Sequence, residues 1–306
     1  MKVLITGSTG FIGRNLLELS KSNTEYNEIY TVARTYNQSH IEGKHKSHFC
    51  VDLSVQSEVE YLFTRIKPDI IFHLAGEANP KINNKDINRH ITININGTHN
   101  LLRFCPDGCK FIYTSSVVIY GDGRSEFPYF ETDIDITKPT SLYGYSKLMG
   151  ENLVDYYANR KLVGISARLC ANIGLGMTHG ILKDFLKKAK SDNPEFEILG
   201  DKPGSCKPYM YVLDTCSALM AIAKNIYSKK LNVCPNDNIT TQEICAIVQE
   251  ELRTEKPIKW LGETVNFEGD NRIINCACKE LYNVTNWQPH FKTSKAAIRY
   301  VVRNSI

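Results

Sequence analysis

A tyrosine and a lysine with the spacing of a proton-transfer pair stand in the segment Tyr143-Gly-Tyr-Ser-Lys147. In a helix this spacing puts both side chains on one face. A tyrosine is a weak acid with an ordinary pKa of about 10. A neighbouring ammonium favours the phenolate and would lower that pKa, so the pair could move a proton near neutral pH. Two exposed polar residues on a helix show the same spacing by chance, and only the surroundings distinguish the two cases.

A hydroxyl that could serve the same reaction follows the apolar run 110–114, which predicts a strand. Ser116 comes at the carboxyl end of this strand, where it could hydrogen-bond a substrate carbonyl or alkoxide. A strand that is simply capped by serines at a turn is the alternative. His73 ends the run Ile70-Ile-Phe-His73, and we expect it to be a hydrogen-bonded core histidine rather than a catalyst.

The elements that must position these groups begin with a glycine turn. The apolar run Val3-Leu-Ile5 predicts a strand, Gly7-x-x-Gly10-x-x-Gly13 follows, and helical periodicity comes next. Glycine spacing carries information in this strand–turn–helix context. The turn lets backbone N–H groups approach a pyrophosphate, which the helix N-terminus also favours. The segment therefore predicts a dinucleotide site.

Strand and helix patterns then alternate as far as about residue 171. Further strands are predicted at 29–33, 49–51, 70–75, 110–114 and 163–168, and helices at 55–66, 90–104 and 143–160. This alternation predicts an α/β fold, a Rossmann-like doubly wound parallel sheet with its ligand at the carboxyl ends of the strands. We expect the NAD(P)-binding domain to span 1–171 with a returning segment at about 209–234. Segments 172–208 and 235–306 would form a smaller C-terminal α/β substrate domain.

Composition limits the class of protein. The chain has 306 residues, 42% of them hydrophobic, and a formal net charge of +4, which is too small to indicate nucleic-acid binding. It contains no apolar run of about 18 residues, so no membrane span is expected. Because the chain starts with a core strand, we expect no signal peptide and a cytoplasmic location. Most of the ten cysteines stand singly in apolar segments, which predicts reduced core thiols and no metal site.

In this order and at these intervals, the motifs resemble the extended short-chain dehydrogenase/reductase family of nucleotide-sugar enzymes, the NAD-dependent epimerase/dehydratase family. The matching segments span nearly the whole chain and include Gly7–Gly13, Asp52-Leu53, His73-Leu-Ala-Gly76, Asn94-Ile-Asn-Gly97-Thr98, Ser115-Ser116, Tyr120-Gly121, Tyr143-x-x-x-Lys147 and Arg168-x-x-x-Asn172. The resemblance implies that Tyr143 is the proton donor or acceptor and that Lys147 hydrogen-bonds the nicotinamide ribose. Ser116 would polarise the substrate oxygen.

The resemblance also implies which residues contact the ligands. Those expected at the cofactor are Gly7, Thr9, Gly10, Phe11, Ile12, Gly13, Arg34, Asp52, Leu53, Leu74, Ala75, Gly76, Asn94, Tyr143 and Lys147. Those expected at the substrate are Glu77, Ser116, Asn172, Lys207 and Arg272. Asn172 would contact the diphosphate. Lys207 stands where relatives often have arginine, so it offers a point charge without the fork geometry, and Arg272 is the other cation expected at the diphosphate.

Two departures from the family pattern favour one reaction. The 4,6-dehydratases have an Asp-Glu pair where this chain has Val117-Val118, which can act as neither acid nor base. Epimerases commonly end the second strand with an acidic residue, and this chain has Ala33-Arg34. An arginine there would pair with the 2′-phosphate of NADP, which predicts NADP (NADPH); an arginine that only begins a loop would leave NAD as the cofactor.

Consumed NADPH suits a net reduction, so the chain looks most like the GDP-4-keto-6-deoxy-mannose reductase-like nucleotide-sugar 4-reductases. Two alternatives stay open, an NAD-dependent nucleotide-sugar 4-epimerase and a non-catalytic NADP-binding regulator. The resemblance further implies a homodimer formed through the helices at about 91–104 and 143–160. Core packing explains the same apolar positions, among them Leu101, Leu148, Leu153, Val154 and Tyr157.

Overall fold

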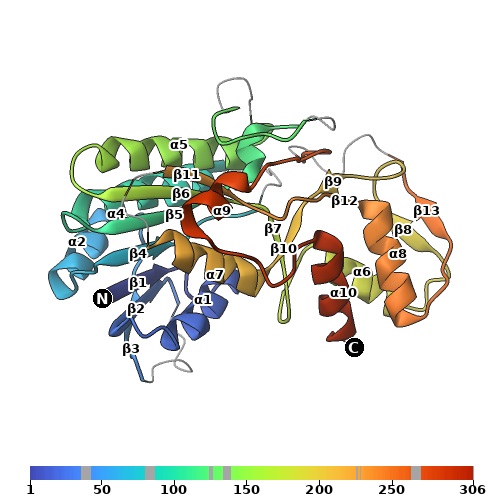
Figure 1. Cartoon of the computed structure of the whole chain (residues 1–306), viewed down its shortest axis with the longest axis horizontal. Helices are drawn as coiled ribbons and strands as arrows, with labels where there is room; N and C mark the ends of the chain where they lie inside the picture. Colours follow the sequence, from blue (N-terminus) through green and yellow to red (C-terminus); the bar gives the residue numbers. More distant parts are fainter. Residues whose placement is uncertain are drawn as a thin grey trace.

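The computed structural model describes residues 1–35, 43–79, 87–123, 127–133, 139–224, 227, 229–262 and 270–305. Its main feature is a seven-stranded sheet in the order β11-β6-β5-β4-β1-β2-β3 (Figure 1). All neighbouring strands of this sheet are parallel. The strands are β1 Lys2–Thr6, β2 Glu28–Ala33, β3 His45–Cys50, β4 Ile70–His73, β5 Lys110–Ser116, β6 Val163–Leu169 and β11 Lys229–Val233. The predicted doubly wound parallel sheet is confirmed.

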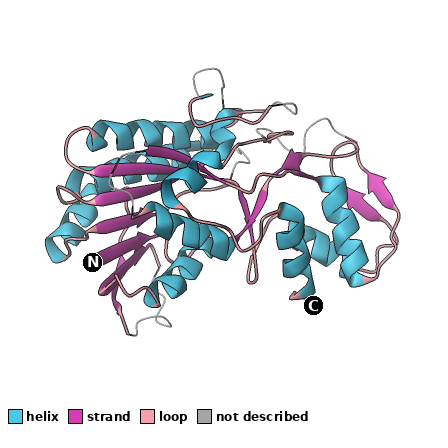
Figure 2. Cartoon of the chain, in the orientation of Figure 1, coloured by secondary structure: helices cyan, strands magenta, loops and turns pink. Residues whose placement is uncertain are grey.

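Helices cover both faces of this sheet, as Figure 2 shows. Because side chains alternate along a strand, the apolar residues of β1 contribute to two separate cores. Val3 and Ile5 belong to the core that includes Leu16 of α1 (Phe11–Lys21) and residues of α7 (Val212–Ile222). Leu4 belongs to the core on the opposite face, whose helices are α2 (Gln56–Arg65), α4 (Thr98–Phe104) and α5 (Leu142–Ala158). The sheet is therefore buried on both sides, which explains the continuous apolar runs in its strands.

The helix predicted over 90–104 is irregular. It begins as the short α3 (Ile87–Arg89), continues as the π-helix η2 (His90–Gly97) and ends as α4. A side chain on Gly97 would press against Leu53, since a Cβ there would lie 3.3 Å from the Leu53 Cβ. π-Helical turns often occur at functional sites. Here the turn carries the buried Asn94.

The smaller part of the structure lies beyond the carboxyl ends of the strands (Figure 1). It contains the helices α6 (Ile181–Lys190), α8 (Thr241–Leu252) and α10 (Ser294–Arg303), whereas α9 (Lys279–Thr285) packs against β11 and α7 of the larger part. Short strands pair in twos: β7 (Ala171–Ile173) with β10 (Tyr209–Tyr211), β9 (Cys206–Lys207) with β12 (Ile239–Thr240), and β8 (Phe196–Ile198) with β13 (Ile258–Trp260). Among the helices described, none has the length and apolar character needed to cross a membrane. All ten cysteines are free thiols, and only Cys50 is exposed.

A buried ion pair joins α5 to β6. Arg168 and Glu151 are both fully buried, and the guanidinium donates to the two carboxylate oxygens at 3.0 and 2.8 Å. Arg168 also donates to the Tyr120 hydroxyl at 2.7 Å and to the Glu131 carbonyl at 2.8 Å. The Tyr120 hydroxyl in turn donates to Asn232 Oδ1 on β11. Tyr120 ends η3 (Val117–Tyr120), the single helical turn that directly follows β5.

The ion pair gives a stability prediction. Glu151→Leu leaves a buried guanidinium without its counter-charge and should lower the free energy of unfolding by about 3–5 kcal/mol. The double variant Glu151→Leu/Arg168→Met should recover part of this loss because no buried charge is then left unpaired.

Urea denaturation of both variants checks this, with Lys224→Met as the matched control. Lys224 forms an exposed ion pair with Glu25, and its loss should change the unfolding free energy by no more than about 1 kcal/mol. If Glu151→Leu costs no more than this control, the proposed role of the buried pair is wrong.

Candidate active site

A cavity of about 200 Å³ lies at the carboxyl ends of β1, β2 and β4. Many of the residues predicted to contact a cofactor line it: Gly7, Thr9, Gly10, Arg34, Asp52, Leu53, Leu74, Ala75 and Gly76. Val32, Ala33, Val51 and Ile93 also line it and were not predicted. Phe11, Ile12 and Gly13 form the first turn of α1 and are not among the lining residues, although Gly10, the N-cap of that helix, is.

The glycines of the turn are required by close packing. Gly7 has a φ of +67°, and a Cβ there would lie 2.6 Å from the Ala75 nitrogen. A Cβ on Gly13 would overlap the Gly7 carbonyl oxygen. The turn can therefore press against the end of β4 and against α1 only without side chains. Such a cradle fits the backbone N–H contacts that a pyrophosphate needs at a helix N-terminus.

Arg34 follows the last residue of β2 and lies exposed at the rim of the same cavity. Opposite it, Asp52 accepts hydrogen bonds from the Ser54 hydroxyl at 2.7 Å and the Ser54 nitrogen at 2.9 Å. These bonds, together with the Arg34 charge, hold the pKa of Asp52 below its usual value. The rim thus presents one guanidinium that is free to approach a ligand.

A second cavity, of about 260 Å³, lies at the carboxyl ends of β5 and β6. Ser116, Tyr143 and Lys207 line it, as the sequence suggested. The other lining residues were not predicted to contact substrate: Val117, Val118, Ser141, Leu169, Cys170, Ala171, Pro208, Asp270, Asn271 and Ile274. Some carried a usable signal. Ser141 precedes a helical pattern as an N-cap does, and Cys170 and Ala171 follow a predicted strand at its ligand-binding end.

The structure brings Ser116, Tyr143 and Lys147 together. Ser141 caps α5 by accepting a hydrogen bond from the Gly144 nitrogen at 3.2 Å, which places Tyr143 in the first turn. Ser116 and Tyr143 line the same cavity, and Ser116 lies close enough to favour the ionised form of the Tyr143 phenol. Lys147 lies one turn further, with its Nζ 5.9 Å from the centre of the Tyr143 ring. The predicted helix, spacing and strand end thus converge on one point.

The protonation of this group differs from the sequence expectation. Burial raises the pKa of Tyr143 to about 12, and the nearby Ser116 hydroxyl only partly offsets this rise. The expected lowering by Lys147 is not found, because its Nζ instead donates to the Thr114 carbonyl at 2.8 Å. Burial also lowers the pKa of Lys147 to about 8, against the opposing effect of Glu151. Near neutral pH Tyr143 therefore carries its proton and can act as a donor.

The Asn94 side chain forms hydrogen bonds with other residues of the protein and does not line the cavity. Its Nδ2 donates to the Ser146 hydroxyl at 2.9 Å and to the Glu77 carbonyl at 3.0 Å, and its Oδ1 accepts from the Glu77 nitrogen at 2.7 Å. Asn94 therefore connects the segment after β4 to α5. It is not among the residues that line the cavity of the glycine turn, where a cofactor contact was expected.

His73 is a core histidine. Its two ring nitrogens hydrogen-bond the hydroxyls of Thr6 at 2.8 Å and Thr98 at 2.9 Å. Burial lowers its pKa to about 3, so the ring is neutral.

Of three residues predicted to contact substrate, Lys207 lines the Tyr143 cavity, and Glu77 and Arg272 do not. The Lys207 ammonium lies in the wall of the Tyr143 cavity, 2.6 Å from an Asp270 carboxylate oxygen. Glu77 is outside that wall and pairs with Arg89 at 2.9 Å. Arg272 is exposed and also outside it.

Asn172, the residue expected at the diphosphate, is engaged within the protein. Its Nδ2 donates to the Cys170 carbonyl at 2.8 Å, and its Oδ1 accepts from the Thr215 hydroxyl at 2.5 Å. The preceding residue, Ala171, lines the cavity instead. Because side chains alternate along β7, Ala171 and Asn172 point to opposite sides.

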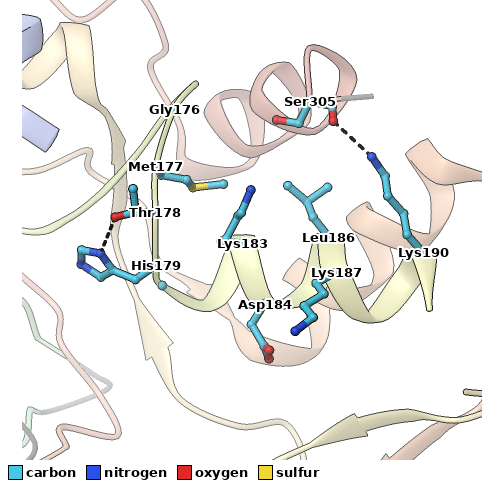
Figure 3. Close-up of a pocket in the computed structure, with 12 residues that line it drawn as sticks. Gly176, Met177, Thr178, His179, Lys183, Asp184, Leu186, Lys187, Lys190 and Ser305 are labelled. Atoms are coloured by element: carbon cyan, nitrogen blue, oxygen red, sulfur yellow. Dashed lines mark hydrogen bonds between the residues drawn. The ribbon is translucent and has the colours of Figure 1, made fainter.

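A third cavity, of about 470 Å³, lies along one side of α6. Figure 3 shows Lys183, Lys187 and Lys190 along this helix, with Lys190 hydrogen-bonded to the Ser305 carbonyl at 3.2 Å. None of the residues that the sequence analysis named as cofactor or substrate contacts lines this third cavity. Among the described residues, no group of three or more His, Cys, Asp or Glu side chains could hold a metal ion.

The sequence pattern of the NAD dependent epimerase/dehydratase family matches residues 3–234, which include both the glycine turn and Tyr143. The chain belongs to this family. Its members bind NAD(P), and a nucleotide-sugar-modifying, NAD(P)-dependent activity is the function that membership indicates.

Individual proteins match this chain over nearly its full length, one in sequence and two in structure. The chain is 27% identical over 314 residues to a GDP-6-deoxy-D-talose 4-dehydrogenase of Aggregatibacter actinomycetemcomitans, covering 100% of this chain and 98% of the relative. The structure of Thermus thermophilus UDP-glucose 4-epimerase in complex with NAD matches with a TM-score of 0.84 at 23% identity, over 99% and 98% of the two chains. RMD from Pseudomonas aeruginosa complexed with NADPH matches with a TM-score of 0.80 at 20% identity, over 100% and 99%.

The lowered pKa of Lys147 gives a prediction for stability. Between about pH 8 and 10.5 Lys147 is neutral in the fold and takes up a proton on unfolding, so the wild type gains stability as the pH rises through this window. Lys147→Met removes the buried ammonium and should be more stable than the wild type at pH 7. Its advantage should shrink above pH 8.

Thermal unfolding at pH 7 and pH 9.5 measures this, with the exposed Lys183→Met as the control whose difference from the wild type should not vary with pH. An advantage of Lys147→Met that stays constant between these pH values would contradict the assignment.

Proposed function

We propose that the protein reduces the C4 keto group of a nucleotide-linked 4-keto-6-deoxy sugar, with GDP as the favoured nucleotide, at the expense of NADPH. The observation that carries this proposal is that Ser116 and Tyr143 line one cavity at the ends of β5 and β6, with Lys147 one turn further along α5. In our proposal the dinucleotide is held by the segments 1–171 and 209–234. The nucleotide sugar lies against 172–208 and 235–306.

Three side chains of the protein would take part in the proton transfer. Bound NADPH would supply the hydride that adds to C4. Ser116 would hydrogen-bond the C4 oxygen, and Tyr143 would donate its phenolic proton to that oxygen, so that C4=O becomes C4–OH. Lys147 would then stabilise the phenolate by its charge, and its ammonium would hydrogen-bond the nicotinamide ribose. With a pKa of about 12, Tyr143 holds its proton near neutral pH, as a donor in the direction of reduction must.

The cavity wall supports a reductase over a dehydratase. Elimination of water needs an acid and a base beside the sugar. The positions next to Ser116 are Val117 and Val118, and both line the cavity with apolar side chains. The relative with 27% identity is a GDP-6-deoxy-D-talose 4-dehydrogenase, an enzyme for position 4 of a GDP-linked 6-deoxy sugar. This similarity is the reason for favouring GDP.

The cofactor proposal rests on Arg34 and on the glycine cradle. A guanidinium at the cavity rim can form two charge-assisted hydrogen bonds with a 2′-phosphate, which NADP has and NAD lacks. We therefore propose NADP as the cofactor, with NAD as the alternative.

We also propose a homodimer through α5 and the helix before it. Tyr145, Met149 and Tyr156 are exposed large hydrophobic residues of α5. Leu101 and Val154, which the sequence offered as interface positions, are fully buried in the core and are not available to a partner.

Arg34→Ala should weaken NADPH binding by about 10- to 100-fold, the loss of a charge-assisted pair, and NADH binding much less. Fluorescence titration of the two cofactors measures this. The control is Arg65→Ala, at an exposed arginine of α2, which should leave both affinities unchanged. An equal loss for NADPH and NADH would refute the cofactor assignment.

Tyr143→Phe should lower kcat by about 10²- to 10⁴-fold, since it removes the proton donor, and should leave NADPH binding intact. The measurement is NADPH consumption, followed optically, with GDP-, UDP-, dTDP- and CDP-linked 4-keto-6-deoxy sugars. Tyr61→Phe, at an exposed tyrosine of α2, is the control and should keep its activity.

Stoichiometric NADPH oxidation with one of these sugars would establish the 4-reductase and its nucleotide. If the wild type consumes no NADPH but interconverts unreduced nucleotide sugars without added cofactor, the protein is a 4-epimerase. Binding of NADP without either reaction would indicate a regulator.

A further inference from the structure

Asn271 carries a buried polar group that has no partner among the residues that the structure describes. The side chain is only 2% exposed. Its Oδ1 accepts a hydrogen bond from the Thr140 hydroxyl at 3.0 Å, but its Nδ2 is buried without any hydrogen bond. A buried amide donor normally finds an acceptor, because leaving it unpaired destabilises the fold. An orphan of this kind needs an explanation.

Its position offers one. Asn271 lines the same cavity as Ser116 and Tyr143. Thr140, which holds the carboxamide, directly precedes Ser141, the N-cap of α5. The amide is therefore anchored beside the helical turn that carries Tyr143.

The neighbouring groups of the cavity leave the amide available. Asp270, the adjacent residue, has a carboxylate oxygen 2.6 Å from the Lys207 ammonium. Much of the remaining wall is apolar, with Val117, Val118 and Ile274 among its residues. Because none of the described residues accepts a hydrogen bond from this amide, a molecule bound in the cavity can supply the acceptor.

We propose that Asn271 Nδ2 donates a hydrogen bond to a hydroxyl oxygen of the bound hexose, other than the reacting C4 oxygen, and so acts as a specificity-determining residue. The inference rests on the proposed function only in that a nucleotide sugar enters this cavity. A neutral amide suits a sugar hydroxyl, and its anchorage next to Tyr143 places it at the reacting end of the substrate. The diphosphate is the other source of an acceptor oxygen, and the experiment separates the two.

The unpaired donor predicts opposite effects on stability and on binding. Asn271→Leu keeps a similar side-chain volume and removes the unsatisfied amide. The ligand-free variant should therefore have a Tm above that of the wild type. Its affinity for the nucleotide sugar should fall by about 10-fold, the loss of one buried hydrogen bond. A merely structural asparagine would instead give a lower Tm when replaced.

The experiment measures Tm and dissociation constants for the wild type and two variants. Isothermal titration calorimetry in the presence of NADP⁺ uses GDP-, UDP-, dTDP- and CDP-linked hexoses and the corresponding nucleoside diphosphates. Asn271→Leu should weaken binding of the nucleotide sugar and leave the affinity of the nucleoside diphosphate within about two-fold. Thr140→Val is the matched control: it removes the anchor but keeps the Asn271 donor, and should weaken sugar binding less.

Three results would overturn the proposal: a lower Tm for ligand-free Asn271→Leu, an equal loss of affinity for the nucleoside diphosphate, or a wild type that binds none of these hexose compounds. The proposed reaction can fail separately. If the wild type binds a nucleotide sugar, Asn271→Leu loses that affinity, and no NADPH is ever consumed, the role of Asn271 stands and the 4-reductase does not.

Discussion

The buried ion pair between Arg168 and Glu151 holds in place the elements on which the candidate site depends. Neither residue reaches solvent, so the desolvation of two charges must be offset inside the protein. The guanidinium achieves this through its bonds to Glu151, to the Tyr120 hydroxyl and to the Glu131 carbonyl. These contacts fix α5 on β6 and fix both to the turn after β5. The same three segments supply Tyr143, the cavity wall at Leu169 and Ser116.

The ion pair also orders the charges along α5. Tyr143, Lys147 and Glu151 follow one another at intervals of four residues, so they lie on one face of the helix. Glu151 forms an ion pair with Arg168, and its charge also raises the pKa of Lys147 against the effect of burial. Tyr143, at the start of the helix, keeps its proton because its phenol is buried. The same face of α5 therefore carries a proton donor at the cavity, Tyr143, and a carboxylate that is paired with Arg168 in the core, Glu151.

Local patterns were enough to predict the parts of the structure that local physics determines. The glycine turn, the apolar strands β4 and β5, and the pairing of Tyr143 with Lys147 all follow from periodicity and sterics within a few residues. Asn172 shows where such reasoning fails, since the face of a strand residue depends on the register that β7 adopts with β10. Asn271 was missed because its partner Thr140 lies 131 residues away and no periodic pattern surrounds it. The pKa of Tyr143 likewise depends on burial, which spacing does not reveal.

The position of β11 has a consequence for how the chain can be divided. The chain leaves the large sheet after β6, builds β7 and α6, and then returns to place β11 in parallel alongside β6. A fragment that stopped near residue 171 would keep the glycine turn and Tyr143, yet the edge of β6 would present unpaired N–H and C=O groups to solvent. Tyr120 would also lose the Asn232 acceptor. The large sheet is therefore complete only with β11, which comes later in the chain than β7 and α6. For this reason we expect that residues 1–171 alone do not fold as an independent domain.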